Sequence, residues 1–333
     1  LSTNRDSYVG LAGGFGTVLL GTLTGPTRAL GTALDVNVGA TGIGANSALL
    51  GKLGNKLNGS TSGTGSYSGG STCARSASCN SIFDSRWKNA IAYVSPTFGG
   101  LNATVAYVAN ENKAMDGMAA ASTSGFDTGL RYAQGPIMAA VTYNAVITND
   151  ATDLKISDLR VGGSYNFGTA SVRAVFDLAR ADKLGGKKFT QAVYGLGATF
   201  DLTPASKLLA QVYVARDLKQ DGSSQDDSGA KLFELGFQHS LSKRTMLKAT
   251  YALIKNDTNA NYDQPGRHAR GLQCGGRIGA GDFIRCAPHL LIQPESSPNA
   301  GWSRTGTFGC PFFVDTRLPP ASVKKPPAVK REA

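Results

Sequence analysis

Apolar and polar side chains alternate along residues 88–256, in blocks separated by turns and polar loops. Successive side chains of a β-strand point to opposite faces, so each block predicts a strand with one apolar and one wetter face. In the block 205–217, for example, Leu208 and Val212 share the apolar face, and Gln211 lies on the other. The charged residues of such blocks fall on the face opposite the apolar row.

The same pattern predicts twelve strands. They lie at residues 5–12, 16–22, 88–95, 101–109, 125–133, 137–147, 156–166, 169–180, 188–200, 205–217, 230–240 and 245–255. Strands of about ten residues, joined by short turns at one end and longer loops at the other, are typical of outer-membrane barrels. We therefore predict an all-β fold, a transmembrane antiparallel up-and-down β-barrel whose apolar rows face lipid.

A soluble β-sandwich is the alternative fold, because its strands also alternate. Its function would be that of a β-rich adhesin or binding module. Sandwich strands average about 5 to 6 residues and need large side chains to fill a core, whereas these rows contain many Ala, Gly and Val. The chain has no run of about 18 apolar residues, which excludes a bundle of membrane-spanning helices. Its charged fraction of 17% excludes a highly charged disordered chain. The first six residues have no features of a secretion signal.

Residues 23–87 are rich in Gly, Ser, Thr and Asn and show no regular pattern. A loop of this length in a compact fold is usually functional or disordered, and one folded into a barrel would narrow its lumen. We predict the constriction here. Its candidate charged residues are Asp35, Lys52, Lys56, Arg75, Asp84 and Arg86. Cys73 and Cys79 either form a disulfide in the oxidising periplasm or stay free thiols.

If the apolar rows face lipid, the opposite rows place charged side chains on a water-facing wall. These are Asp6, Lys88, Asp127, Arg131, Asp158, Arg160, Arg173, Asp177, Lys207, Glu234 and Lys248. Six are basic and five acidic, and rings of charged side chains set the ion preference of pores, so we expect a weak preference for anions. For most of these residues individually, a solvated position without a specific role is the alternative.

The composition changes near Gln264. Residues 264–333 contain ten of the 34 basic and four of the 23 acidic residues, which accounts for six units of the net charge of +11, and nine of the 13 prolines. We expect a barrel domain at 1–263 and a Pro- and Arg-rich non-barrel tail at 264–333 that is disordered, translated from a shifted reading frame, or an appended segment. Its Cys and His residues lack metal-ligand spacing, so we predict no metal, no cofactor and no nucleic-acid partner.

Several segments resemble the general porins of Gram-negative bacteria, particularly those of β-proteobacteria. They are Tyr93–Leu101, followed by an alternating strand, Gly163–Gly168, and Leu241–Thr245 before the strand ending at Asn256. The resemblance covers roughly residues 5–263. It implies a sixteen-stranded barrel, assembled as a homotrimer in the outer membrane, whose third external loop folds inward as an eyelet. On that plan the predicted strands correspond to strands four to fifteen, and 23–87 to the eyelet loop.

Two features depart from the family pattern. Relatives often carry an arginine after the glycine that leads into the eyelet loop, where this chain has Thr22 after Gly21. Relatives also end in a closing strand with a terminal aromatic residue, whereas this chain ends at Ala333. The first departure weakens the expectation of an arginine-lined constriction, and the second weakens that of a closed barrel.

The expected function is passive diffusion of ions and small hydrophilic solutes through the outer membrane, with membrane lipid as a further partner. The alternative is an outer-membrane enzyme, which would need a Ser–His pair oriented by a third group. His239 is the only histidine in the patterned region, and it neighbours Ser240 in sequence. Adjacent residues of a strand point to opposite faces, so we expect no enzymatic activity.

Overall fold

The structure is a computed structural model, and it describes residues 6–37, 43–54, 81–84, 86–112, 121–149, 153–243, 245–260, 262 and 283–292. All of its strands belong to one sheet, and every pairing in it is antiparallel. The strands are β1 Ser7–Gly13, β2 Gly16–Thr24, β3 Arg86–Val94, β4 Leu101–Asn112, β5 Ala121–Gln134, β6 Ile137–Asn149, β7 Lys155–Asn166, β8 Ala170–Leu184, β9 Lys187–Thr203, β10 Ser206–Ala215, β11 Lys219–Gln220, β12 Ser223–Ser224, β13 Ala230–Ser240, β14 Thr245–Asn256 and β15 Phe283–Ile292. The helical elements are α1 Pro26–Leu34 and the single turns η2 Asn46–Ala48 and η3 Ile82–Asp84.

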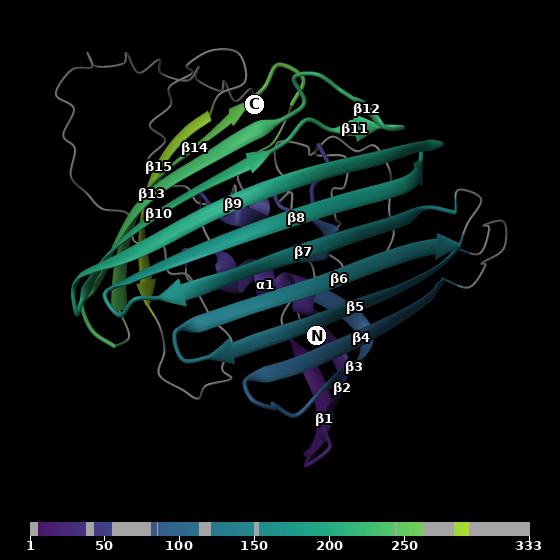
Figure 1. The fold of residues 1–333 in the computed structure, drawn as a ribbon, viewed down its shortest axis with the longest axis horizontal. Coiled ribbons are helices and arrows are strands. Elements are labelled where there is room, and N and C mark those ends of the chain that lie inside the picture. Colours follow the sequence, from purple (N-terminus) through teal and green to yellow (C-terminus); the bar gives the residue numbers. More distant parts are fainter. Residues whose placement is uncertain are drawn as a thin grey trace, which may run out of the picture.

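Each strand pairs with its neighbour in sequence, apart from the small β11–β12 hairpin, which lies beside β9. Figure 1 shows the strands β4–β9 inclined in the same direction and the sheet curving around α1. The strand order begins at β1 and ends at β15, and no pairing between these two strands is recorded in the described part. The prediction of an antiparallel up-and-down barrel fold is confirmed, and all twelve predicted strands are present as β1–β10, β13 and β14.

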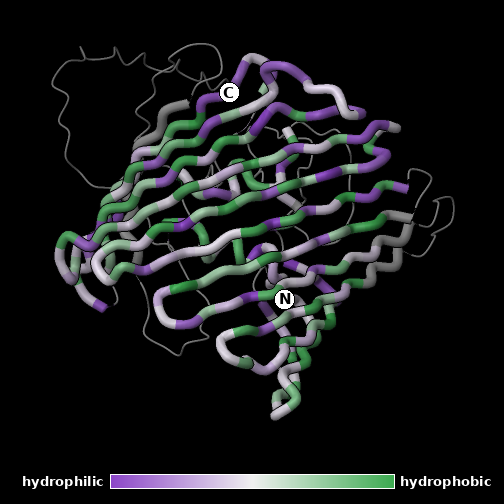
Figure 2. Tube along the Cα trace, in the orientation of Figure 1, coloured by the Kyte–Doolittle hydropathy of each residue, from purple (hydrophilic) through white to green (hydrophobic). Residues whose placement is uncertain are grey.

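The two faces of the sheet differ in the way that the alternation predicts. In β13, Phe233 and Leu235 are 45% and 51% exposed, whereas Glu234 between them is 0% exposed. In β10, Val212 is 40% exposed and the adjacent Gln211 only 3%. Figure 2 shows the resulting alternation of hydrophobic and hydrophilic positions along the strands. The apolar rows therefore face outward, and the polar rows face the interior.

Aromatic side chains gather on the outer face near the short turns. Tyr93, Phe98, Tyr165, Phe167 and Phe200 are all exposed, and the rings of Tyr165 and Phe167 lie 4.5 Å apart. A belt of aromatic residues at the end of the apolar band is typical of barrels that span a membrane, because amphipathic rings favour the lipid–water interface.

Two regions contain elements that the alternation does not predict. The loop 23–87 contains α1 and two helical turns, and Phe283–Ile292 forms β15 within the Pro-rich tail. β15 pairs with β14 over ten residue pairs, from Thr245↔Ile292 to Ile254↔Phe283. An edge strand presents unpaired N–H and C=O groups, so pairing there depends on the backbone more than on side-chain periodicity. No helix in the described residues is long and apolar enough to cross a membrane.

Candidate functional site

The loop that follows β2 folds into the interior of the sheet, and its helix α1 begins against the wall. Pro26 opens the helix, where its fixed φ is favourable and its missing N–H costs nothing. The N-cap residue Gly25 has no side chain to cap the first turn. Asp127 of β5 takes that role instead, since it accepts hydrogen bonds from the Thr27 backbone N–H at 3.2 Å and from Thr27 Oγ1 at 2.6 Å. A carboxylate at this end also interacts favourably with the helix dipole.

α1 lies close to strands β5 to β8, and two glycines make this close approach possible. A Cβ atom on Gly31 would lie 2.4 Å from Nη1 of Arg160, and one on Gly162 of β7 would lie 2.3 Å from Cδ1 of Leu34. Real Cβ atoms do not approach neighbours so closely. The helix and the wall are therefore complementary in shape at these two positions.

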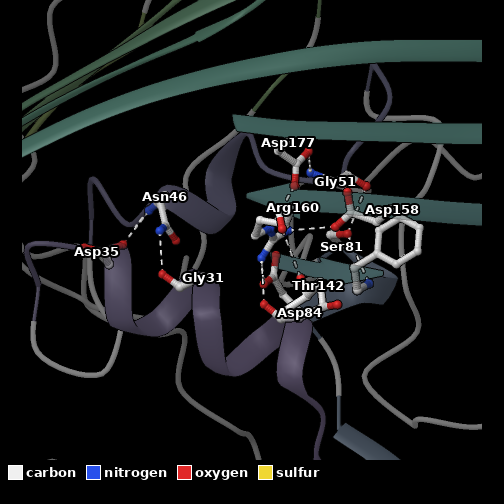
Figure 3. A network of polar contacts seen from close by, with 12 residues as sticks. Gly31, Asp35, Asn46, Gly51, Ser81, Asp84, Thr142, Asp158, Arg160 and Asp177 are labelled. Carbon is white, nitrogen blue, oxygen red and sulfur yellow. Dashed lines mark hydrogen bonds and ion pairs between the residues drawn. The ribbon is translucent and has the colours of Figure 1, made fainter. Parts of the chain in front are cut away.

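The first anchor of the loop is the Arg160 cluster, which consists of Arg160, Asp84, Asp158 and Asp177 (Figure 3). The guanidinium donates through Nε to Asp177 at 2.8 Å, through Nη2 to Asp158 at 3.1 Å and through Nη1 to Asp84 at 3.3 Å. Nη1 also donates to the Thr27 carbonyl at 3.1 Å. Arg160, Asp158 and Asp177 are fully buried. One cation thus joins two wall carboxylates to two separate parts of the loop.

A backbone contact completes this cluster. The N–H of Gly51 donates to Asp177 at 3.0 Å, and the Gly51 carbonyl accepts from Ser81 Oγ at 2.9 Å. Ser81 precedes Asp84, so the segments 43–54 and 81–84 of the loop are tied to each other and to β8. A buried cation among three carboxylates needs such additional donors, because their negative charge is otherwise unbalanced.

The second anchor is the Gln211 cluster, which consists of Gln211, Asp35, Asn37, Glu234 and Lys248. The amide nitrogen of Gln211 donates to Glu234 at 2.6 Å, to Asp35 at 3.2 Å and to the Gly44 carbonyl at 2.7 Å. Asn37 donates to Glu234 at 2.8 Å and accepts a bond from Lys248 Nζ. Neutral amides therefore join the loop to the strands β10, β13 and β14.

Asp35 organises the loop just beyond α1. Its carboxylate accepts bonds from the backbone N–H groups of Asn46 at 2.6 Å and Asn37 at 2.7 Å. The side chain of Asn46 donates in turn to the Gly31 carbonyl at 2.7 Å (Figure 3). Burial raises the pKa of Asp35, and the N–H donors only partly oppose that effect. Arg173 of β8 donates to the carbonyl oxygen of the same residue.

A third set of contacts holds the loop at Gly54. The N–H of Gly54 donates to Gln191 Oε1 at 2.7 Å and to the Tyr262 hydroxyl at 3.1 Å. The Tyr262 hydroxyl donates to Gln191 at 2.7 Å, and burial raises the pKa of this hydroxyl. The loop is consequently held at β5, β7, β8, β9, β10, β13 and β14, around much of the interior.

The structure brings together many of the charged residues that the sequence singles out. Asp84, Arg160 and Asp177 meet in the Arg160 cluster, and Asp35, Glu234 and Lys248 meet in the Gln211 cluster. The other predicted residues take different positions. Lys52 is buried within the loop, and Arg131 is exposed. Arg86 pairs with Asp6 at 2.6 Å, and Lys207 pairs with Asp201 at 3.2 Å. Lys88 lies partly exposed at the register shift between β2 and β3, and Arg173 is partly exposed and bonded to the Asp35 carbonyl oxygen. Lys56, Arg75, Cys73 and Cys79 lie outside the described residues, and the disulfide stays a prediction.

Several side chains that hold the loop are uncharged, so a search of the sequence for charged residues does not find them. Asn37, Asn46, Gln191, Gln211 and Tyr262 make these contacts, and nothing in their local sequence marks them. The segment Gly25–Pro26–Thr27 does contain a usable signal, because Pro at the first position is typical of a helix start.

The structure also contains a Ser–His contact different from the one considered in the sequence. Ser206 Oγ lies 2.8 Å from Nδ1 of His239, its cross-strand partner. Catalysis by such a pair requires a third group that orients the imidazole, and no carboxylate bonded to His239 is recorded in the part of the chain that the structure describes. The same part contains no group of three His, Cys, Asp or Glu side chains that could hold a metal ion.

Comparison with known proteins agrees with this architecture. The family of Gram-negative porins matches residues 1–259. The chain is 30% identical over 277 residues to outer membrane porin protein 32 of Delftia acidovorans, covering 82% of this chain and 68% of the relative. It is 24% identical over 203 residues to an outer membrane porin protein of Bordetella pertussis, covering 51% of this chain and 53% of the relative.

Solved structures give the same picture. An anion-selective porin from Comamonas acidovorans superposes with a TM-score of 0.64 at 25% sequence identity, covering 86% of this chain and 78% of that one. OmpT of Vibrio cholerae superposes with a TM-score of 0.54 at 15% identity, covering 86% of this chain and 81% of that one, and shares the fold.

Proposed function

Since the chain belongs to the Gram-negative porin family and is an outer-membrane porin, we propose that ions and small hydrophilic solutes diffuse passively through it, with a weak preference for anions. We propose the loop 23–87 as its constriction. Barrels of this kind act through a polar lumen, a narrowing and a lipid-facing band, and they require no chemical step.

The observation that carries the anion preference is the burial of the wall carboxylates beneath the loop. Four of the five acidic wall residues are at most 1% exposed: Asp127, Asp158, Asp177 and Glu234. The fifth, Asp6, accepts the bond from Arg86. Although the sequence gives nearly equal numbers of acidic and basic wall residues, the loop leaves few carboxylates in contact with the solution.

Cationic side chains remain accessible on the same wall. Arg131 is exposed, and Arg173 is partly exposed and bonded to a neutral carbonyl oxygen. Accessible charges of one sign in a confined aqueous space raise the local concentration of counter-ions. The similarity to an anion-selective porin from Comamonas acidovorans supports the same preference.

The reversal potential across a planar bilayer, measured under a KCl gradient with the refolded full chain, tests this proposal. We expect a sign that indicates preference for chloride, and a shift toward potassium in the Arg173→Glu variant. Arg180→Glu is the matched control, because Arg180 lies exposed on β8 in the row of Val172 and Phe176, which faces outward. Potassium preference in the unmodified protein would refute the proposed selectivity.

We also propose that the protein assembles as a homotrimer in outer-membrane lipid, as the family resemblance implies. An unheated sample on a detergent gel should migrate at three times the mass of 34.6 kDa and at the monomer mass after boiling. Migration as a monomer in mild detergent at all protein concentrations would contradict a stable trimer.

A further inference from the structure

A cavity of about 140 Å³ lies inside the sheet, between α1 and the strands β4 to β6. One side of it is a single face of the helix, formed by Pro26, Ala29, Leu30 and Ala33. The spacing i, i+3, i+4 and i+7 places these side chains together. Ala29 and Ala33 remain exposed, since their small side chains leave the space beside them open.

The opposite side of the cavity is the wall. Met138 and Ala140 of β6 supply apolar surface there, and Asn102 and Thr104 of β4 add polar groups. Arg131 of β5 also lines the cavity. It is exposed, and no hydrogen bond or ion pair of its guanidinium with any described residue is recorded. A largely apolar space therefore adjoins an available cation.

The size and chemistry of this cavity define a class of ligand. An apolar protein cavity of about 150 Å³ is large enough to bind benzene, so this one is large enough for a single aromatic ring or a short branched alkyl group. A guanidinium presents parallel donors that match the two oxygens of a carboxylate. A chloride ion would use only the cation, and a neutral hydrocarbon only the apolar side.

We propose that this cavity is a binding site for monocarboxylates that carry one aromatic ring or short branched alkyl group, with the carboxylate at Arg131 and the hydrocarbon against Ala29, Ala33 and Met138. The proposal rests on the diffusion function above and names a class of solute for it. The site lies on the inner face of the sheet, beside helix α1 of the loop that we propose as the constriction. Binding must be weak for a solute to leave, as in any conducting pore.

Single-channel recordings of the refolded full chain test the proposal with three matched probes. Benzoate has both a ring and a charge, acetate has the charge without the ring, and benzyl alcohol has the ring without the charge. We expect benzoate to reduce the chloride current in a concentration-dependent manner, with an apparent affinity at least about tenfold higher than that of either other probe. Equal effects of benzoate and acetate would overturn the proposal.

Two variants locate the effect. Arg131→Gln removes the cation and Ala29→Leu fills the cavity, and each should lower the apparent benzoate affinity about tenfold, while the control Arg180→Gln on the outer face should not. Undiminished benzoate affinity in both variants would also overturn the proposal. Titration calorimetry of the protein in detergent with benzoate distinguishes the proposed channel function from the proposed binding site. If benzoate bound in an Arg131-dependent manner but the protein carried no chloride current, the channel function would be refuted and the binding site would be supported.

Discussion

The two clusters that anchor the loop perform the same task with different chemistry. In the Arg160 cluster one buried guanidinium is bonded to three carboxylates, so the arrangement depends on a single side chain. In the Gln211 cluster neutral amides distribute the contacts among a cation, two carboxylates and a backbone carbonyl. A buried charge that loses its partner is far more costly than a lost neutral hydrogen bond, so the first anchor should be the more fragile.

The largest effect is expected for Arg160→Met, which leaves three carboxylates close together without their cation. Removing one partner of a buried ion pair costs about 3–5 kcal/mol. The midpoint of unfolding in urea, followed by circular dichroism in detergent micelles, should fall accordingly. The single-channel conductance should rise, since the loop loses the bonds that Arg160 of β7 makes to Thr27 and Asp84.

Arg180→Met serves as the control for this variant, because it removes an exposed arginine from the neighbouring strand β8. The proposed difference between the clusters would be wrong if Arg160→Met and Arg180→Met had similar unfolding midpoints and conductances.

A smaller effect is expected for Gln211→Leu. The variant leaves Asp35 and Glu234 without one donor each, but Asn46, Asn37 and Lys248 remain in place, and we expect a loss of about 2 kcal/mol. The same urea measurement applies, with Gln220→Leu in the short strand β11 as the control. A loss as large as that of Arg160→Met would show that the two anchors are equally fragile.

A third substitution tests the packing of α1 against Arg160 without changing any charged residue. Gly31→Ala places a methyl group 2.4 Å from Arg160 Nη1, so the guanidinium must shift, and we expect a loss of about 1 kcal/mol by overpacking. Gly14→Ala is the matched control, because a Cβ there meets nothing within 4 Å. Equal stability of the two variants would contradict the tight packing of α1 on β7.

The smallest effect concerns the pH dependence of the Gln211 cluster. Because burial raises the pKa of Asp35 above its usual 3.8, the folded state binds this proton more strongly than the unfolded state. The contribution to stability is complete below pH 3.8 and is lost as the pH rises through the folded value. The stability of the wild type relative to Asp35→Asn should therefore decline from pH 3.8 upward, and a rise would contradict the burial of this carboxyl group.

The sequence predicts the sheet well because a strand's faces follow directly from a period of two. Leu208 and Val212 lie on the outer face, and Gln211 on the inner face, as the alternation requires. The loop is recognisable by its length and its Gly-rich composition, but only Pro26 marks the start of α1, because the polar cap of this helix comes from Asp127, 100 residues away. The amide partners of Asp35 and Glu234 could not be identified either, since contacts between distant residues depend on how the loop packs.

The exposure of the charged wall residues could not be predicted from the sequence either. Alternation places both Arg131 and Asp158 on the inner face, and the structure agrees, but only the packing of the loop determines that one is exposed and the other fully buried. Counting charges along the strands therefore predicts a nearly neutral wall, whereas the exposed part of that wall is cationic.

Comparing the reversal potentials of Arg131→Gln and Asp158→Asn under one KCl gradient tests most directly whether the loop hides the acidic residues of the wall. The two substitutions each remove one charge from the same inner face. Our account predicts that Arg131→Gln lowers the preference for chloride and that Asp158→Asn leaves the reversal potential unchanged. An equal or larger shift for Asp158→Asn would contradict it.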